Sequence, residues 1–301
     1  MRIFVDFGDK QNKKNIRSEF RIFYGIFREF SPDLVLDSVF FTENVDETVN
    51  KLYETDSFRS KRDAGDQNIN VQGKFVIAKN GTKHLVFSSS LYVSGFESII
   101  RFLIFIHELT HLHNKLSFPK IDESNYTNGL YLYNLQSLFD EYFADRVSLS
   151  IINRICTKLY PQKEETLNNH ILNGVEGYIS ILNSQKDYDF IKLEISKFRL
   201  HGDVEKFLRK INQKVNDITT LTTHLFAHIH EFPSLENWME KISSHFVNEN
   251  CIELMDFLKS KYEEKNYDLS DRINLSEEYF CSFGYRFEQR QTGPYCTVID
   301  I

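Results

Sequence analysis

The sequence predicts an α+β protein that is mainly helical and carries one small antiparallel sheet. Twelve Gly and five Pro are few for 301 residues, while 27 Phe and 15 Tyr are many. Such a composition favours long uninterrupted elements over turn-rich β architecture. Asn80-Gly81 lies between two β-prone runs, 75–79 and 82–87. Because both residues of this dipeptide accept positive φ, it predicts a two-stranded antiparallel hairpin.

Helix boundaries follow from capping residues and prolines. Ser94 and Glu97 have the spacing of a capping box, which predicts a helix start at Ser94, and that helix must end before Pro119. A second long helix is predicted over 132–159, with Pro161 as its stop.

Further amphipathic helices are expected from about residue 165 to 262, and the tail 284–301 is either a last hairpin or an unpacked end. The polar segment 57–73 reads as a loop. We therefore expect a core at 1–160 that holds both motif helices described below, and a helical part at 161–301 that closes the cleft.

Charge and hydropathy exclude several classes of function. The 36 basic and 43 acidic residues give a net charge of −7, without a basic stripe, so nucleic acid is not an expected partner. The most apolar stretch, 99–106, contains Arg101 and is far shorter than the roughly 20 residues that cross a bilayer. The first residues turn polar too soon for a secretory signal, and the four cysteines form no C-x-x-C pair. A cytoplasmic protein with reduced thiols and no membrane partner is expected.

The residues that indicate chemistry begin at His107-Glu108-Leu109-Thr110-His111. On a helix, His107 and His111 lie on one face a turn apart, where both imidazoles can bind one zinc ion. Glu108 is turned about 100° from His107, so its carboxylate can act as general base on a water activated by the zinc. The alternative is that both histidines are hydrogen-bonded core residues. The apolar surroundings of this helix favour the metal site, because buried polar pairs need a reason.

A catalytic zinc site needs a third protein ligand. Glu141 and Asp145 are four residues apart on the second long helix, and the small Ala144 would allow two helices to approach closely. We expect Glu141 as the ligand, with Asp140 or Asp145 as substitutes. Asp145 is expected to accept a hydrogen bond from the far nitrogen of a ligand histidine.

These two motifs resemble those of gluzincin-type zinc metallopeptidases, in which a helix with H-E-x-x-H is followed by a helix with E-x-x-x-D. Residues 107–111 and 141–145 match them, with 29 residues between His111 and Glu141. This spacing is most similar to the ImmA/IrrE-like and HtpX-like bacterial peptidases, and the resemblance covers about residues 74–150. It implies a zincin-like fold with the small sheet over the metal-binding helix pair. Asn114 and Ser117 stand where metzincins need Gly and His.

A downstream run around Pro233 is similar to the His-Pro segment that follows the metal helices in several of these families. His230 is the first candidate to stabilise the oxyanion, and His228 is the second. The equal alternative is that these histidines are core or surface residues whose nitrogens are hydrogen-bonded and have no catalytic role. His224 and His228 also have i, i+4 spacing, but no carboxylate motif accompanies them.

The sequence therefore predicts a zinc-dependent endopeptidase with Glu108 as general base and a protein or peptide substrate. The hairpin edge is expected to pair with an extended substrate peptide. The resemblance implies limited proteolysis of a specific protein, with a bacterial regulatory or phage-response partner. The alternatives are a catalytically inactive zincin-like regulatory or binding module, and a helical interaction protein without a metal.

Overall fold

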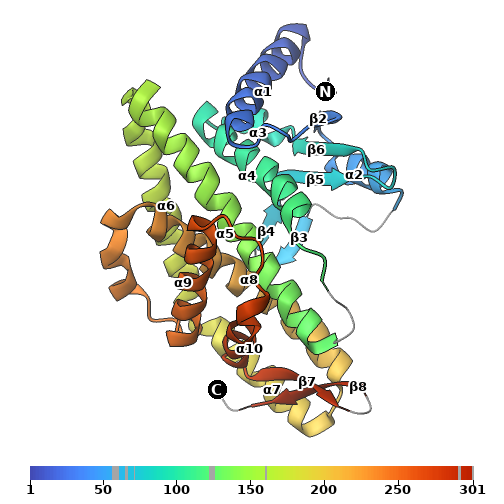
Figure 1. The fold of residues 1–301 in the computed structure, drawn as a ribbon, viewed down its shortest axis with the longest axis vertical. Coiled ribbons are helices and arrows are strands. Elements are labelled where there is room, and N and C mark those ends of the chain that lie inside the picture. Colours follow the sequence, from blue (N-terminus) through green and yellow to red (C-terminus); the bar gives the residue numbers. More distant parts are fainter. Residues whose placement is uncertain are drawn as a thin grey trace. The chain divides into compact units, whose positions relative to one another are not determined.

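The computed structural model describes residues 1–55, 61–64, 67–70, 72–121, 126–159, 161–290 and 293–299. It is mainly helical with small sheets, so the predicted α+β class is confirmed (Figure 1). The chain forms two compact units. Unit 1 comprises Met1–Leu116 and Val147–Leu167, and unit 2 comprises Ser117–Arg146 and Asn168–Ile301. Both units are discontinuous in sequence, and a functional division at residue 160 stays a prediction.

The sheet of unit 1 contains both parallel and antiparallel strands. Its described strands follow the order β1-β2-β6-β5; they are β1 (Arg2–Val5), β2 (Ser38–Thr42), β6 (Lys83–Ser88) and β5 (Gly73–Ile77). The predicted hairpin is confirmed, because β5 and β6 pair antiparallel around the Asn80-Gly81 turn. The predicted wholly antiparallel sheet is wrong, because β1, β2 and β6 run parallel. The helix α1 (Lys10–Phe30) supplies the crossover that a parallel β1–β2 pair requires.

Two helices of unit 1, α1 and α2 (Val45–Tyr53), begin at side-chain caps. The carboxylate of Asp9 accepts the amide of Asn12 at the start of α1. Asn44 accepts the amide of Glu47 in the same way at the start of α2, which follows β2. Such caps satisfy amides that have no partner within the helix, so they fix where each helix begins.

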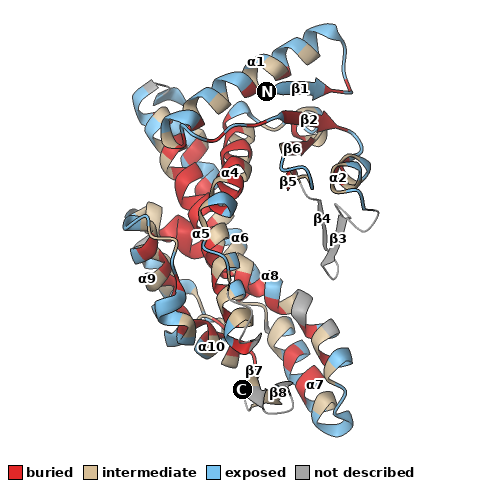
Figure 2. Ribbon diagram, turned by 45° about the vertical axis from the view of Figure 1, so that its right-hand side comes forward, coloured by how far each residue is buried: buried red, intermediate tan, exposed pale blue. Residues whose placement is uncertain are grey.

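The helix α4 (Ser98–Ser117) packs on this sheet through aromatic rings. Phe105 is fully buried and lies 4.6 Å from the ring centre of Phe87, 5.5 Å from that of Phe20 and 5.6 Å from that of Phe41. Ring pairs at such distances add to the free energy of apolar burial. Figure 2 shows α4 coloured as buried along most of its length. The helix that carries both histidines is therefore held rigidly against the sheet.

The predicted start of this helix is wrong, and its predicted end is confirmed. Ser94 is the C-cap of a short helix, α3 (Ser90–Val93), and its amide donates to the carbonyl of Ser90. Gly95 follows with φ +74°, a left-handed conformation that interrupts helical geometry. A second helix then begins at Ser98, and it ends at Ser117, before Pro119.

The remaining helices agree with the sequence pattern. The helix α5 (Tyr126–Leu159) begins earlier than predicted and ends where Pro161 requires. It is followed by η1 (Pro161–Lys163), α6 (Glu164–Leu182), α7 (Gln185–His201), α8 (Val204–Glu231), η2 (Pro233–Lys241), α9 (Glu249–Glu263), η3 (Ser270–Arg272) and α10 (Ile273–Cys281). The tail forms an antiparallel pair of β7 (Tyr285–Arg290) and β8 (Gly293–Val298).

The segment 57–73, expected to be a loop, contains a strand pair. β3 (Lys61–Ala64) and β4 (Gln67–Asn70) run antiparallel, while residues 56–60, 65, 66 and 71 lie outside the described part. Among the described helices, none is both long and apolar enough to cross a bilayer.

Candidate metal centre

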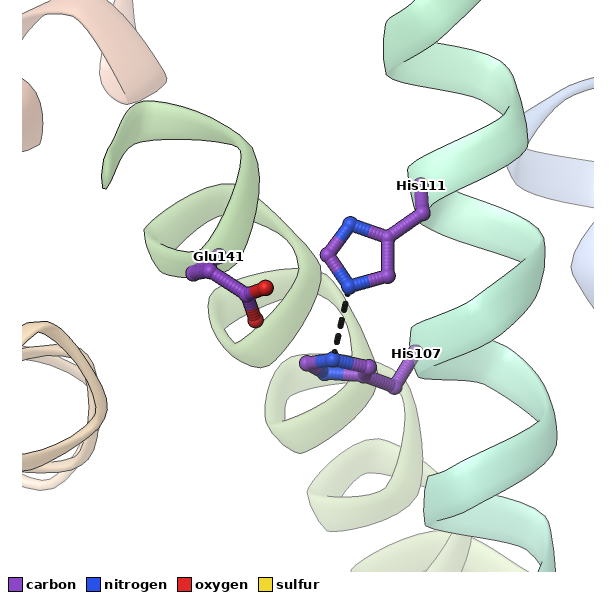
Figure 3. A group of neighbouring side chains, drawn as sticks. All are labelled: His107, His111 and Glu141. Atoms are coloured by element: carbon purple, nitrogen blue, oxygen red, sulfur yellow. Dashed lines mark hydrogen bonds between the residues drawn. The ribbon is translucent and has the colours of Figure 1, made fainter. Parts of the chain in front are cut away.

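The two histidines of the helical motif converge on one point. His107 and His111 lie one turn apart on α4, and their Nε2 atoms are 2.8 Å apart. The ring planes stand at 87° to each other. Figure 3 draws the two rings on the helix together with Glu141. His111 is buried and His107 is half-buried. The Nε2 atoms of both imidazoles therefore point toward one position beside the helix.

Glu141 completes a group of three donors. It projects from α5, and its carboxylate is directed toward the two imidazoles (Figure 3). One ligand atom each from His107, His111 and Glu141 lies within 4.8 Å of the others. Within the described residues this is the one such group of three or more His, Cys, Asp or Glu side chains. It contains neither of the two substitutes considered from the sequence, Asp140 and Asp145.

The donor set fits zinc. Two imidazoles and one carboxylate are a donor set of catalytic zinc sites, which keep a fourth position for water or substrate. Tetrahedral zinc at about 2.0–2.1 Å from two imidazole nitrogens holds these nitrogens roughly 3.3 Å apart. The Nε2 atoms are 2.8 Å apart, a hydrogen-bond distance, and the three ligand atoms lie within 4.8 Å of one another, so the side chains would have to adjust to the tetrahedral distances when zinc binds.

Glu108, the predicted general base, lies directly against strand β5. A Cβ atom added to Gly73 would lie 2.7 Å from Cγ of Glu108 and 2.8 Å from Cε1 of Phe87. Cβ atoms essentially never show contacts this short, so only glycine lets the strand approach the Glu108 side chain so closely. The ring of Phe75, two residues along the same strand face, lies 6.1 Å from that of His111. An isolated glycine in a strand pattern is the sequence signal for such an approach.

Asp145 is buried and contacts a histidine of α8. Its Oδ2 lies 2.5 Å from Nδ1 of His224, whose ring stacks on Tyr178 at 5.8 Å. The carboxylate thus fixes the orientation of the His224 ring. No local sequence signal pairs these two residues, which are 79 positions apart. The predicted hydrogen bond from a metal-binding histidine to Asp145 stays a prediction.

His230 belongs to a buried hydrogen-bond network that also includes Tyr142, the residue that follows Glu141 in the sequence. Arg146 Nη1 donates to the Tyr142 hydroxyl at 2.9 Å, and that hydroxyl lies 2.7 Å from His230 Nδ1. Arg146 Nε also donates to Glu231 at 3.0 Å. When the neutral His230 ring carries its proton on Nε2, Nδ1 accepts the Tyr142 hydroxyl proton, and the hydroxyl oxygen accepts from Arg146. Burial, with the nearby charges of Lys259 and Arg146, lowers the pKa of His230 to about 4.

His228, the second candidate for oxyanion stabilisation, donates from Nδ1 to the carbonyl of His224 at 2.7 Å. Burial lowers its pKa as well. Neither His228 nor His230 belongs to the three-donor group, and their proposed catalytic role stays a prediction.

Comparison of the chain with protein-family models, with curated proteins and with solved structures found no match.

The neutral state of His230 predicts how stability depends on pH. Its pKa is about 4 in the folded chain and about 6.5 in the unfolded chain. Between these values the unfolded chain binds more protons, so stability falls as the pH falls through this window. In urea unfolding at pH 7.5 and 4.5, the advantage of the wild type over His230→Asn should shrink by about 2–3 kcal/mol at the lower pH. The exposed His201→Asn controls for loss of a histidine elsewhere. An advantage of equal size at both pH values would contradict the network.

Proposed function

We propose that the protein is a zinc-dependent metallopeptidase of the gluzincin type that carries out limited proteolysis of a specific protein. The observation that carries this proposal is the convergence of His107, His111 and Glu141, with one ligand atom from each within 4.8 Å of the others. Glu108 adjoins the first histidine, where a general base is needed. The two-motif resemblance, which rests on these same residues, implies the same chemistry.

The three ligand residues and Glu108 have different roles in the proposed peptide hydrolysis. His107, His111 and Glu141 would hold the ion, and bound zinc supplies Lewis acidity that polarises the scissile carbonyl and acidifies a water. Glu108 accepts the proton of the attacking water, whose oxygen forms a bond to the carbonyl carbon. When the C–N bond breaks, Glu108 returns that proton to the leaving nitrogen. The close approach of Gly73 to Cγ of Glu108 limits the conformations open to this side chain.

Strand β5 supports binding of an extended peptide. It is the last strand of the described sheet on its side. The amide of Ser88 donates to the carbonyl of Gln72, and the amide of Ala78 donates to that of Thr82. By antiparallel alternation, even-numbered residues of β5 bond to β6, so the amides of Gly73 and Phe75 face the other way. A substrate strand added there would run past Glu108, which contacts Gly73.

Zinc binding tests the ligand set. The zinc-loaded, dialysed protein should retain about one zinc per chain. Glu141→Ala should weaken zinc binding by more than about 100-fold in competition with a chromophoric chelator, because two histidines alone hold the ion poorly. Asp140→Ala, one residue away on the same helix, is the matched control and should bind as the wild type does. If Asp140→Ala loses zinc while Glu141→Ala retains it, the third ligand is Asp140 and not Glu141. A wild-type protein that binds no zinc would contradict the proposal.

Cleavage tests the base and its position. On a proteome-derived peptide library analysed by mass spectrometry, the zinc-loaded wild type should cleave a defined set of peptides, and Glu108→Gln should keep zinc but cleave none. On the best peptide, Gly73→Ala should lower kcat by about tenfold or more while keeping zinc, because the new methyl group displaces the carboxylate. Gly25→Ala, whose Cβ would meet nothing within 4 Å, is the control. A zinc-loaded wild type that cleaves nothing, or a fully active Glu108→Gln, would contradict the proposal.

A further inference from the structure

Helix α1 carries a line of basic side chains along one face. At about 100° of rotation per residue, six cations of this helix lie within an arc of about 100°. We call them the basic stripe, and they are Lys10, Lys13, Lys14, Arg17, Arg21 and Arg28. The stripe extends about 27 Å along the helix axis. The expectation of a chain without a basic stripe is therefore wrong for α1.

The acidic residues of α1 do not neutralise the stripe. Glu19 and Glu29 both lie outside its arc, and each pairs with a cation of another helix. Glu19 pairs with Arg101 of α4 at 2.6 Å, and Glu29 pairs with Arg154 of α5 at 3.6 Å. The positive face of α1 thus stays separate from its negative residues.

The stripe is open to solvent and keeps its charge. Figure 2 shows much of α1 coloured as exposed or intermediate. Nε of Arg17 donates to the carbonyl of Ile3 at 3.2 Å. Nη2 of Arg28 donates to the carbonyl of Pro32 at 2.6 Å, and both of these acceptors are neutral. Within the part of the chain that the structure describes, none of the six cations pairs with a carboxylate.

This arrangement opposes the stability of the helix. Lys10 and Lys13 lie in the first turn, where the helix dipole disfavours cations, and no acidic residue follows the cap Asp9 in that turn. Cations three and four residues apart also repel one another. The packing of α1 depends on its other face, where Phe20 and Phe27 are fully buried. A pattern that breaks a local rule without a gain for the fold is expected at a functional surface.

The surroundings of the stripe exclude several anionic partners. Its arc contains one aromatic residue, Tyr24, whose hydroxyl donates to the carbonyl of Leu34 at 2.7 Å, so stacking of single-stranded bases is not provided. The apolar face of α1 is packed in the core and cannot insert into a membrane. A duplex groove accepts a helix that is free on most sides, and the net charge of −7 disfavours so wide a polyanion. An acidic segment of a protein remains.

The spacing of the charges favours a helical segment. Stripe residues recur about once per turn, or every 5.4 Å, and a helix with carboxylates three and four residues apart has the same repeat. Side chains on one face of an extended chain recur about every 6.6 Å and would lose register along the stripe. The contact of Arg17 with Ile3 places the stripe beside β1, and β1 and β5 are opposite edges of the described sheet.

We propose that the basic stripe of α1 docks an acidic helix of a partner protein, in which Asp or Glu side chains recur three and four residues apart. The partner binds beside β1 and leaves the β5 edge free. This surface is independent of the proposed peptidase chemistry, and its test requires neither zinc nor cleavage.

Fluorescence anisotropy with a labelled helical peptide measures the docking. The probe has three repeats of Glu-Ala-Ala-Ala-Glu-Ala-Ala, and the full-length protein should bind it saturably. Binding should weaken at least about tenfold between about 50 and 500 mM NaCl, because salt screens exposed charges. A peptide of the same composition with its glutamates spread around the helix should bind about fivefold more weakly or worse. No saturable binding, equal binding of both peptides, or tighter binding to a DNA duplex or to phosphatidylserine vesicles would overturn the proposal.

Two matched quadruple variants locate the surface. The stripe variant is Lys10→Gln, Lys13→Gln, Lys14→Gln and Arg21→Gln. The control variant, at exposed lysines of four other helices, is Lys115→Gln, Lys158→Gln, Lys186→Gln and Lys206→Gln. Both lose four positive charges, but only the stripe variant should lose peptide binding by about tenfold or more.

Thermal melts separate docking from a role in the fold. The stripe variant should melt at the wild-type temperature or above it, because it relieves repulsion along α1. A lower melting temperature than that of the control variant would show that the stripe serves the fold and would contradict the proposal. Equal loss of peptide binding by both variants would show an effect of net charge alone and reject the surface.

Discussion

The packing of Phe105 against the sheet is the interaction on which the rest of unit 1 depends. Phe105 and His107 are two residues apart, so they lie about 200° apart around the helix. Burying Phe105 against Phe20, Phe41 and Phe87 therefore turns His107 away from the sheet. Glu108, about 60° from Phe105 in the other direction, stays near the sheet and meets Gly73. The packing of Phe105 thus turns His107, the proposed ligand, away from the sheet and keeps Glu108, the proposed base, beside strand β5.

Polar contacts within unit 2 orient the residues of α5 up to Arg146. Tyr142 and Arg146 are both buried and join His230 and Glu231 of α8 in one network. Buried networks of this kind are stable only when every member has a partner, so they tolerate little rotation of the helix. Glu141 precedes Tyr142 directly, and its direction follows from this restraint. His230, the histidine expected to stabilise the oxyanion, thus contacts the Tyr142 hydroxyl, and burial lowers its pKa so that the ring is neutral at pH 7.

Local sequence signals predicted the local features, and they did not predict pairings between distant segments. Asn80-Gly81 predicted the hairpin and prolines predicted helix ends, because each acts through its own backbone geometry. The parallel pairing of β1 with β2 was missed, since it joins short strands separated by a long helix. The contact of Asp145 with His224 was missed for the same reason. The helix begins at Ser98 and not at Ser94, because Gly95 adopts a φ of +74° that interrupts helical geometry, which a capping pattern alone does not reveal.

The three-donor group itself was predictable because spacing on two helices determined its members. His107 and His111 share a face at any helix start, so the error at Ser94 did not affect them. Zinc K-edge X-ray absorption of the zinc-loaded protein tests this group most directly. The predicted spectrum contains imidazole scattering from two histidines and only nitrogen and oxygen donors at about 2.0–2.1 Å, with the imidazole signal reduced in His111→Ala. A sulfur shell at about 2.3 Å, or an imidazole signal unchanged by His111→Ala, would contradict the site.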